Sequence, residues 1–157
     1  MLLEVLIAFS LFAVVILATG TGTFFTTAAA SSAQQRSVAY ALVSADIANL
    51  TALPFADLTA GLNPTVDSLA GDPNIQTVGA TYLLRLTGAT LATTNANTSE
   101  SPLVPHITTT TNGIAYKVAT YPQLISSGTV TVVVVVTWHS ALGGTGQVVG
   151  QTQLAAP

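Results

Sequence analysis

Charged side chains are scarce in this sequence. It contains three Lys or Arg and six Asp or Glu residues among 157, or 6 % of the chain, against roughly 25 % in a typical soluble domain. A soluble monomer with so few charges would be poorly protected against self-association, whereas a chain buried among copies of itself has no such difficulty. The net charge of −3 offers no basic surface, so we predict no direct binding of nucleic acid.

Cysteine is absent, which excludes a disulfide scaffold and a cysteine metal site. The two histidines, His106 and His139, lie beside a proline and at a strand end, positions typical of surface residues. The aspartates Asp57, Asp67 and Asp72 do not have the spacing of an EF-hand loop, and no serine or glycine pattern matches a nucleophile elbow or a phosphate loop. We therefore predict that the chain is not an enzyme and holds no cofactor and no metal.

Proline is also missing before Pro54, and the sequence up to about Leu53 predicts one continuous helix. At 1.5 Å per residue such a helix is roughly 75 Å long, more than a bilayer or a small domain requires. Its first half is apolar on every side and contains one charge, Glu4, before Arg36. That half is expected to be buried in lipid or in a protein core.

The second half of this helix has a different period. Val38, Leu42 and Ala45, followed by Ala48 or Asn49, recur at steps of three and four residues. This spacing predicts an amphipathic face that packs on a sheet.

A carboxylate within an apolar helix is unusual, because a charge deep in a bilayer costs roughly 2.5–3.5 kcal/mol. A secretory signal peptide and a plain membrane anchor are the two simple alternatives. Both would place basic residues near the start of the apolar segment, whereas this segment begins with Glu4 and no Lys or Arg.

The segment Leu3-Glu4-Val5-Leu6-Ile7-Ala8-Phe9 resembles the N-terminal signature of the type IV pilin and pseudopilin family. In that family a basic leader is removed, the new N-terminus is methylated, and the remaining helix anchors the subunit in the inner membrane before packing in a filament core. Two features depart from the pattern: the leader is absent, as in a mature chain, and the family usually has one more residue ahead of the glutamate, often Phe. Either one residue is missing from this sequence ahead of the glutamate, or Met1 is the mature terminus. We favour the first interpretation.

The resemblance also implies roles for individual residues. Glu4 would neutralise the N-terminal amine, at Met1, of an adjacent copy during assembly. The helix would melt locally near residues 18–24, where Gly20 and Gly22 alternate with threonines that are weak helix formers. The alternative for this segment is a tight patch for helix packing, as in membrane helix dimers.

The remainder of the chain predicts a head with an α+β fold. Its elements are the helix of residues 36–53, a connecting loop over 54–78 and an antiparallel sheet of about four strands over 79–157. The expected strands are residues 81–87, 107–111, 114–121, 129–139 and 147–154; Asn112-Gly113 marks a hairpin, and the valine run of 129–139 marks a central strand buried on both faces. The first domain would then be the hydrophobic helix of residues 1–35 and the second the head of residues 36–157.

The sequence contains candidate positions for two kinds of glycosylation, N-linked and O-linked. Asn97 lies in an Asn-Thr-Ser sequon within a polar loop and is a candidate for glycosylation. The threonines Thr108 to Thr111 can accept O-linked sugar, although a β-branched edge strand accounts for them more simply.

We therefore predict a structural subunit of a type IV pilus-like filament that polymerises with copies of itself. It would be inserted in the membrane, where it meets the inner-membrane assembly machinery, and would then become part of an extracellular filament suited to cell adhesion. A minor pilin or a type II secretion pseudopilin shares the same signature. A membrane-anchored binding module is the alternative from another class, with residues 89–105 and 140–146 as its candidate binding loops.

Overall fold

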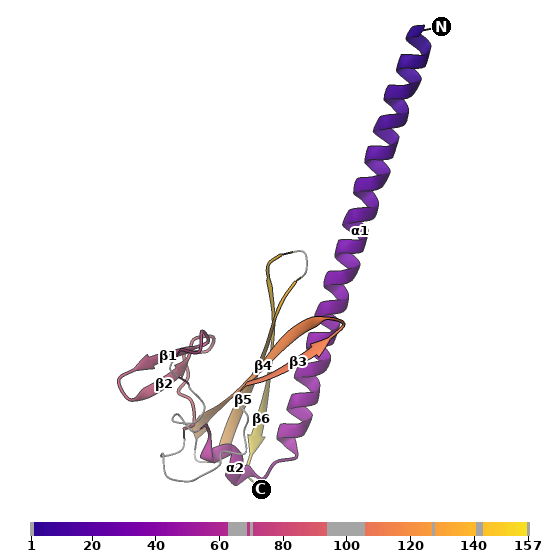
Figure 1. Ribbon diagram of the computed structural model, residues 1–157. Coiled ribbons are helices and arrows are strands. Elements are labelled where there is room, and N and C mark those ends of the chain that lie inside the picture. The colour runs from indigo at the N-terminus through magenta and orange to yellow at the C-terminus, as the bar shows by residue number, and fades with distance from the viewer. Residues whose placement is uncertain are drawn as a thin grey trace. The chain divides into compact units, whose positions relative to one another are not determined.

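A computed structural model describes residues 2–62, 69, 71–93, 106–126, 128–140 and 143–156 (Figure 1). The chain divides into two compact units, Met1–Ser37 and Val38–Pro157, and each is described by itself. The elements in chain order are α1 (Leu2–Thr51), α2 (Phe55–Ala60), β1 (Ile75–Val78), β2 (Thr81–Leu84), β3 (His106–Thr111), β4 (Ile114–Ser126), β5 (Thr129–His139) and β6 (Thr145–Ala155). The α+β fold expected from the sequence is confirmed.

Helix α1 contains 50 residues and ends at Thr51, two residues before the predicted end. It ends where Pro54, which has no backbone N–H to donate, stops a helix from continuing. The C-terminal part of α1 belongs to the second unit and packs on its sheet, as predicted.

The predicted packing face of this part of α1 was partly wrong. Val38 and Leu42 are half-buried, but Ala45, Ala48 and Asn49 are exposed. The buried residues are Ala39, Val43 and Leu50, with the half-buried Ile47 beside them. Both sets have a helical period, and the larger side chains of the second set bury more apolar area, so the helix is rotated toward them.

The main sheet has four antiparallel strands in the order β3-β4-β5-β6. Strand β5 spans the predicted residues 129–139 and lies between β4 and β6. The valines Val132 to Val136 are each no more than 1 % exposed, so β5 is buried on both faces as predicted. The predicted hairpin is also present: Asn112 and Gly113 join β3 to β4 with φ angles of 53° and 75°, the left-handed pair that a two-residue type I′ turn requires.

Neighbouring strand residues point to opposite faces of a sheet, and β4 shows what covers each face. Thr120 Oγ1 donates a hydrogen bond of 2.8 Å to Asp46 Oδ2 on α1. The next residue, Tyr121, contacts Asp72 and Asn74 on the opposite face. The second unit therefore has three layers, with α1 on one face of the sheet and the segment that contains β1 and β2 on the other.

The prediction of a loop over residues 54–78 was wrong in part, because this region contains α2 and β1. The predicted strand 81–87 is shorter, Thr81–Leu84, and pairs with β1 in a separate two-stranded sheet. Leu58, Leu69 and Leu84 from this region are no more than 1 % exposed and belong to the same core as the valines of β5. These elements are stabilised because their leucines bury apolar surface against the face of the sheet that points away from α1.

Candidate functional site

The candidate functional site is the apolar part of α1 within the first unit. Its large hydrophobic side chains are exposed by 53 % or more, and Leu3 by 76 %. They lie on every side of the helix and comprise Leu3, Val5, Leu6, Ile7, Phe9, Leu11, Phe12, Val14, Val15, Ile16, Leu17, Phe24 and Phe25. Fully burying one such side chain is worth about 1.5–3 kcal/mol, so this surface favours any apolar environment strongly.

Seven hydroxyl groups of this segment form hydrogen bonds within the helix itself. Each of seven Ser and Thr side chains donates to a backbone carbonyl three or four residues earlier, at 2.7–3.2 Å. These are Ser10, Thr19, Thr21, Thr23, Thr26, Thr27 and Ser32. A hydroxyl bonded in this way does not need water, so the helix can leave water without losing these hydrogen bonds.

Helix α1 is long and apolar enough to cross a membrane, judged by length and composition. A signal sequence near an N-terminus has the same properties. The structure therefore agrees with the prediction that this chain contains a segment compatible with a membrane.

Glu4 lies in the first turn of α1 and its side chain is exposed. A carboxylate at this end of a helix interacts favourably with the helix dipole. Met1 lies outside the described residues, so the pairing of Glu4 with an N-terminal amine stays a prediction.

Gly20 and Gly22 are both helical, and a Cβ added at either position would meet no atom within 4 Å. The described chain is therefore helical through residues 18–24. Melting was expected within a filament, and it stays a prediction. The glycosylation candidate Asn97 lies outside the described residues.

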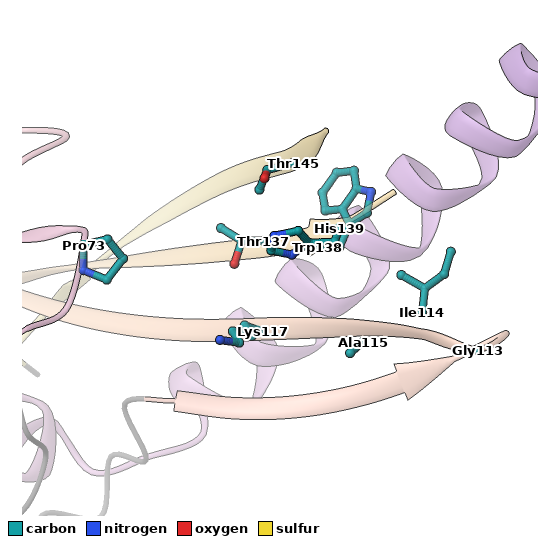
Figure 2. A pocket seen from close by; sticks show the side chains of 9 residues that line it. All are labelled: Pro73, Gly113, Ile114, Ala115, Lys117, Thr137, Trp138, His139 and Thr145. Atoms are coloured by element: carbon teal, nitrogen blue, oxygen red, sulfur yellow. The ribbon is translucent and has the colours of Figure 1, made fainter. Parts of the chain in front are cut away.

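A second feature is a hollow of about 540 Å³ on the sheet, shown in Figure 2. Lys117 on β4 and Thr137 on β5 are cross-strand partners there, and His139 lies two residues further along β5. The described residues that line it are Pro73, Gly113, Ile114, Ala115, Lys117, Thr137, Trp138, His139 and Thr145. Among the described lining residues it includes an ammonium and an imidazole group.

The aspartates considered for calcium have other roles where they are described. Asp72 is buried and accepts hydrogen bonds from Asn74 N at 2.8 Å and from the Tyr121 hydroxyl at 2.6 Å. Asp57 lies in the first turn of α2, and Asp67 lies outside the described residues. Among the residues that the structure describes, no three His, Asp or Glu side chains are arranged to hold a metal ion.

Two polar contacts were not foreseen from the sequence, namely Asp46 with Thr120 and Asp72 with Tyr121. Both join residues far apart in the chain. Burial and the hydrogen bond to Asp72 raise the pKa of Tyr121 well above its usual value, and burial also raises the pKa of Tyr116.

Comparison with known proteins returns no matching family model, no matching curated protein and no matching solved structure.

Proposed function

We propose that this chain is the structural subunit of a type IV pilus-like extracellular filament that polymerises through α1. The observation that carries the proposal is the exposed apolar surface of α1, with Glu4 as its only charge before Arg36. A helix that is hydrophobic on all sides is stable only when it is buried in lipid or in protein. A filament core supplies the protein environment.

The proposed mechanism exchanges one apolar environment for another. In the membrane the helix holds the subunit next to the assembly machinery. On extraction, helices of successive copies pack together, and contacts between side chains replace contacts with lipid. The seven internally bonded hydroxyls keep their partners during this transfer, so it requires no exchange of hydrogen bonds.

Glu4 then sets the position of each added copy. Its carboxylate pairs with the N-terminal ammonium of an adjacent copy, and the unpaired alternative leaves a charge in a dry core at a cost of several kcal/mol. The pair thus selects the correct axial position between helices rather than supplying most of the binding energy.

The head fits a structural role. It contains the low-charge surface expected of a subunit that is largely covered by copies of itself. Its strands carry no described cluster of catalytic groups, and its sheet is filled by aliphatic side chains. We place the assembled chain outside the cell and the unassembled chain in the inner membrane.

The experiment compares Glu4→Ala with Ser10→Ala in cells that make the protein. Ser10 lies on the same apolar helix, and its loss removes one internal hydrogen bond without altering charge. Filaments are sheared from the cells, imaged and analysed by mass spectrometry, which also gives the N-terminal residue and its methylation. We expect both variants in the membrane fraction and only Ser10→Ala in sheared filaments at the unmodified level.

Normal filament yield from Glu4→Ala would overturn the role of Glu4. Absence of the unmodified chain from sheared filaments, together with full retention in membranes, would favour a membrane-anchored binding module. Trace amounts within filaments made of another protein would indicate a minor pilin or a pseudopilin.

A further inference from the structure

Strand β6 forms one outer edge of the main sheet. It contains 11 residues and pairs with β5 over its whole length without a register shift. None of these residues is charged and none is proline. In the part of the chain that the structure describes, no strand lies beyond β6.

A long, regular edge strand is a template for pairing with another strand, and soluble proteins usually protect it with charges, proline or a bulge. This sheet has such protection elsewhere. Strand β4 extends past the end of β3, and this extension contains Pro122, whose carbonyl accepts a hydrogen bond of 2.8 Å from Ala92 N. Strand β6 has no comparable feature in its sequence or register.

The side chains of β6 also favour pairing. On the face away from α1 it presents Gln147, Val149, Gln151 and Gln153, all exposed, with Val149 exposed by 47 %. Glutamine amides form hydrogen bonds to equivalent groups on an adjacent strand, and a half-exposed valine gains from an apolar or β-branched neighbour.

The opposite edge of the same sheet is β3, with six residues, four of them threonine. It contains no Asp, Glu, Lys or Arg. Thr108 and Thr110 are exposed, and their register with β4 places them on the same face of the sheet as Tyr121 and Val149. The two edges of one copy therefore both lack Asp, Glu, Lys and Arg, and both are suited to strand pairing.

We propose that β6 of one copy pairs with β3 of the next copy, so that the four-stranded sheet continues from subunit to subunit. Successive strands alternate in direction, so β3 and β6 of one copy run in opposite directions. Two copies oriented alike therefore bring β6 and β3 together as antiparallel neighbours. This contact uses different surfaces on the two copies, and such a contact repeats without closing unless the rotation forms a ring.

The inference rests on the proposed function in one respect, since a filament with its α1 helices aligned supplies copies oriented alike. Pairing of β6 with β6 is the competing arrangement. It needs a two-fold axis that would point the α1 helices of the two copies in opposite directions, and it produces a closed dimer.

The absence of cysteine allows a direct test with introduced thiols in sheared filaments. Val149→Cys is combined in one chain with Thr108→Cys or with Thr110→Cys, because directly opposed Cβ atoms in antiparallel strands lie about 4.5–5.5 Å apart. Mild oxidation should produce a ladder of cross-linked multimers from one of these double variants, while each single variant stays monomeric on denaturing gels. Val149→Cys combined with Gln76→Cys, exposed on β1, is the matched control and should give no ladder.

A disulfide dimer from Val149→Cys alone would show the two-fold arrangement and overturn the proposal. Filaments of normal yield without cross-links from either double variant would also overturn it, while leaving the helix-based assembly intact. If the unmodified chain forms no filament, both proposals fall.

A second measurement does not depend on cross-linking geometry. Gln151→Lys places a charge on the β6 edge, and Gln76→Lys places the same charge on exposed β1. We expect Gln151→Lys to lower filament yield by about tenfold, the effect of about 1.4 kcal/mol on an equilibrium, and Gln76→Lys to leave it unchanged. Equal yields from the two variants would contradict the proposed pairing.

Discussion

The Tyr121 hydroxyl donates a hydrogen bond of 2.6 Å to Asp72 Oδ2, across 49 residues of sequence. The same hydroxyl accepts a hydrogen bond of 3.0 Å from Asn74 Nδ2, and Asp72 Oδ1 accepts one of 2.8 Å from Asn74 N. Tyr121 is fully buried. This small network attaches the turn before β1 to the main sheet, and with it the layer that covers the face away from α1.

Replacement of Tyr121 by Phe should lower the free energy of unfolding of the head by about 1–3 kcal/mol, because it removes a hydroxyl partner from the buried Asp72. Chemical denaturation of the full chain in detergent, followed by tryptophan fluorescence of Trp138, measures the change. Tyr40→Phe is the matched control, since Tyr40 is 60 % exposed. An equal effect of the two substitutions would show that the network contributes nothing to stability.

Alkaline pH should destabilise the head through its two buried tyrosines. The pKa of Tyr121 and that of Tyr116 are raised in the folded chain, whereas in the unfolded chain both lie near the ordinary value of about 10. Below that value both tyrosines are protonated in the folded and the unfolded chain, and their full contribution to the free energy of unfolding is present. Above it the unfolded chain releases protons that the folded chain retains, so the free energy of unfolding falls as pH rises.

Denaturation midpoints between pH 8 and pH 11, a range that spans the ordinary tyrosine pKa, measure this dependence. Tyr121→Phe should make the decline shallower, while Tyr40→Phe should leave its slope unchanged. A decline of the same slope in all three proteins would assign it to other groups.

Gly150→Ala should destabilise the contact between α1 and the sheet. A Cβ at this position of β6 would overlap Val43 Cγ1 and lie 3.2 Å from Ile47 Cδ1. Overpacking of this kind costs about 1–3 kcal/mol. Gly128→Ala, where a Cβ meets nothing within 4 Å, is the control, and adding Val43→Ala to Gly150→Ala should restore part of the lost stability. No loss in Gly150→Ala would mean that α1 lies farther from β6.

The double variant Gly20→Ala, Gly22→Ala tests melting of α1 in the filament. Both positions have open space, and alanine favours a helix by about 1 kcal/mol per position. We expect the helix of the unassembled chain to be retained and hydrogen exchange of residues 18–24 in filaments to slow markedly. Equally slow exchange in unmodified filaments would show that this segment stays helical after assembly and favour a packing patch.

Local sequence patterns predicted the parts of the fold that depend on near neighbours. The valine run gave the limits of β5, and Asn112-Gly113 gave the β3–β4 hairpin, because turn chemistry and period-two burial act over a few residues. The apolar start of α1 was equally plain. The apolar part of α1 is the candidate site, so most of that site was predictable.

The parts that were missed depend on distant contacts. Strand β1 has four residues and is held by β2 and by Arg85 Nε, which donates to the Ile75 carbonyl at 3.0 Å. The rotation of α1 depends on Gly150 as well as on its own larger side chains, because Gly150 leaves room for Val43 more than 100 residues earlier in the sequence. No local pattern specifies such pairs, and the same holds for Tyr121 and Asp72.

The internally bonded hydroxyls of α1 have a mechanical consequence. From Val5 to Ala30 the helix offers its neighbours a mainly hydrocarbon surface, because the Ser and Thr hydroxyls in this range donate to the helix's own carbonyls. Dispersion contacts lack direction, and their energy changes little when one such rod slides or turns against another. A bundle of these helices resists separation but yields to axial shear, so a filament built from them is expected to be strong and extensible at the same time.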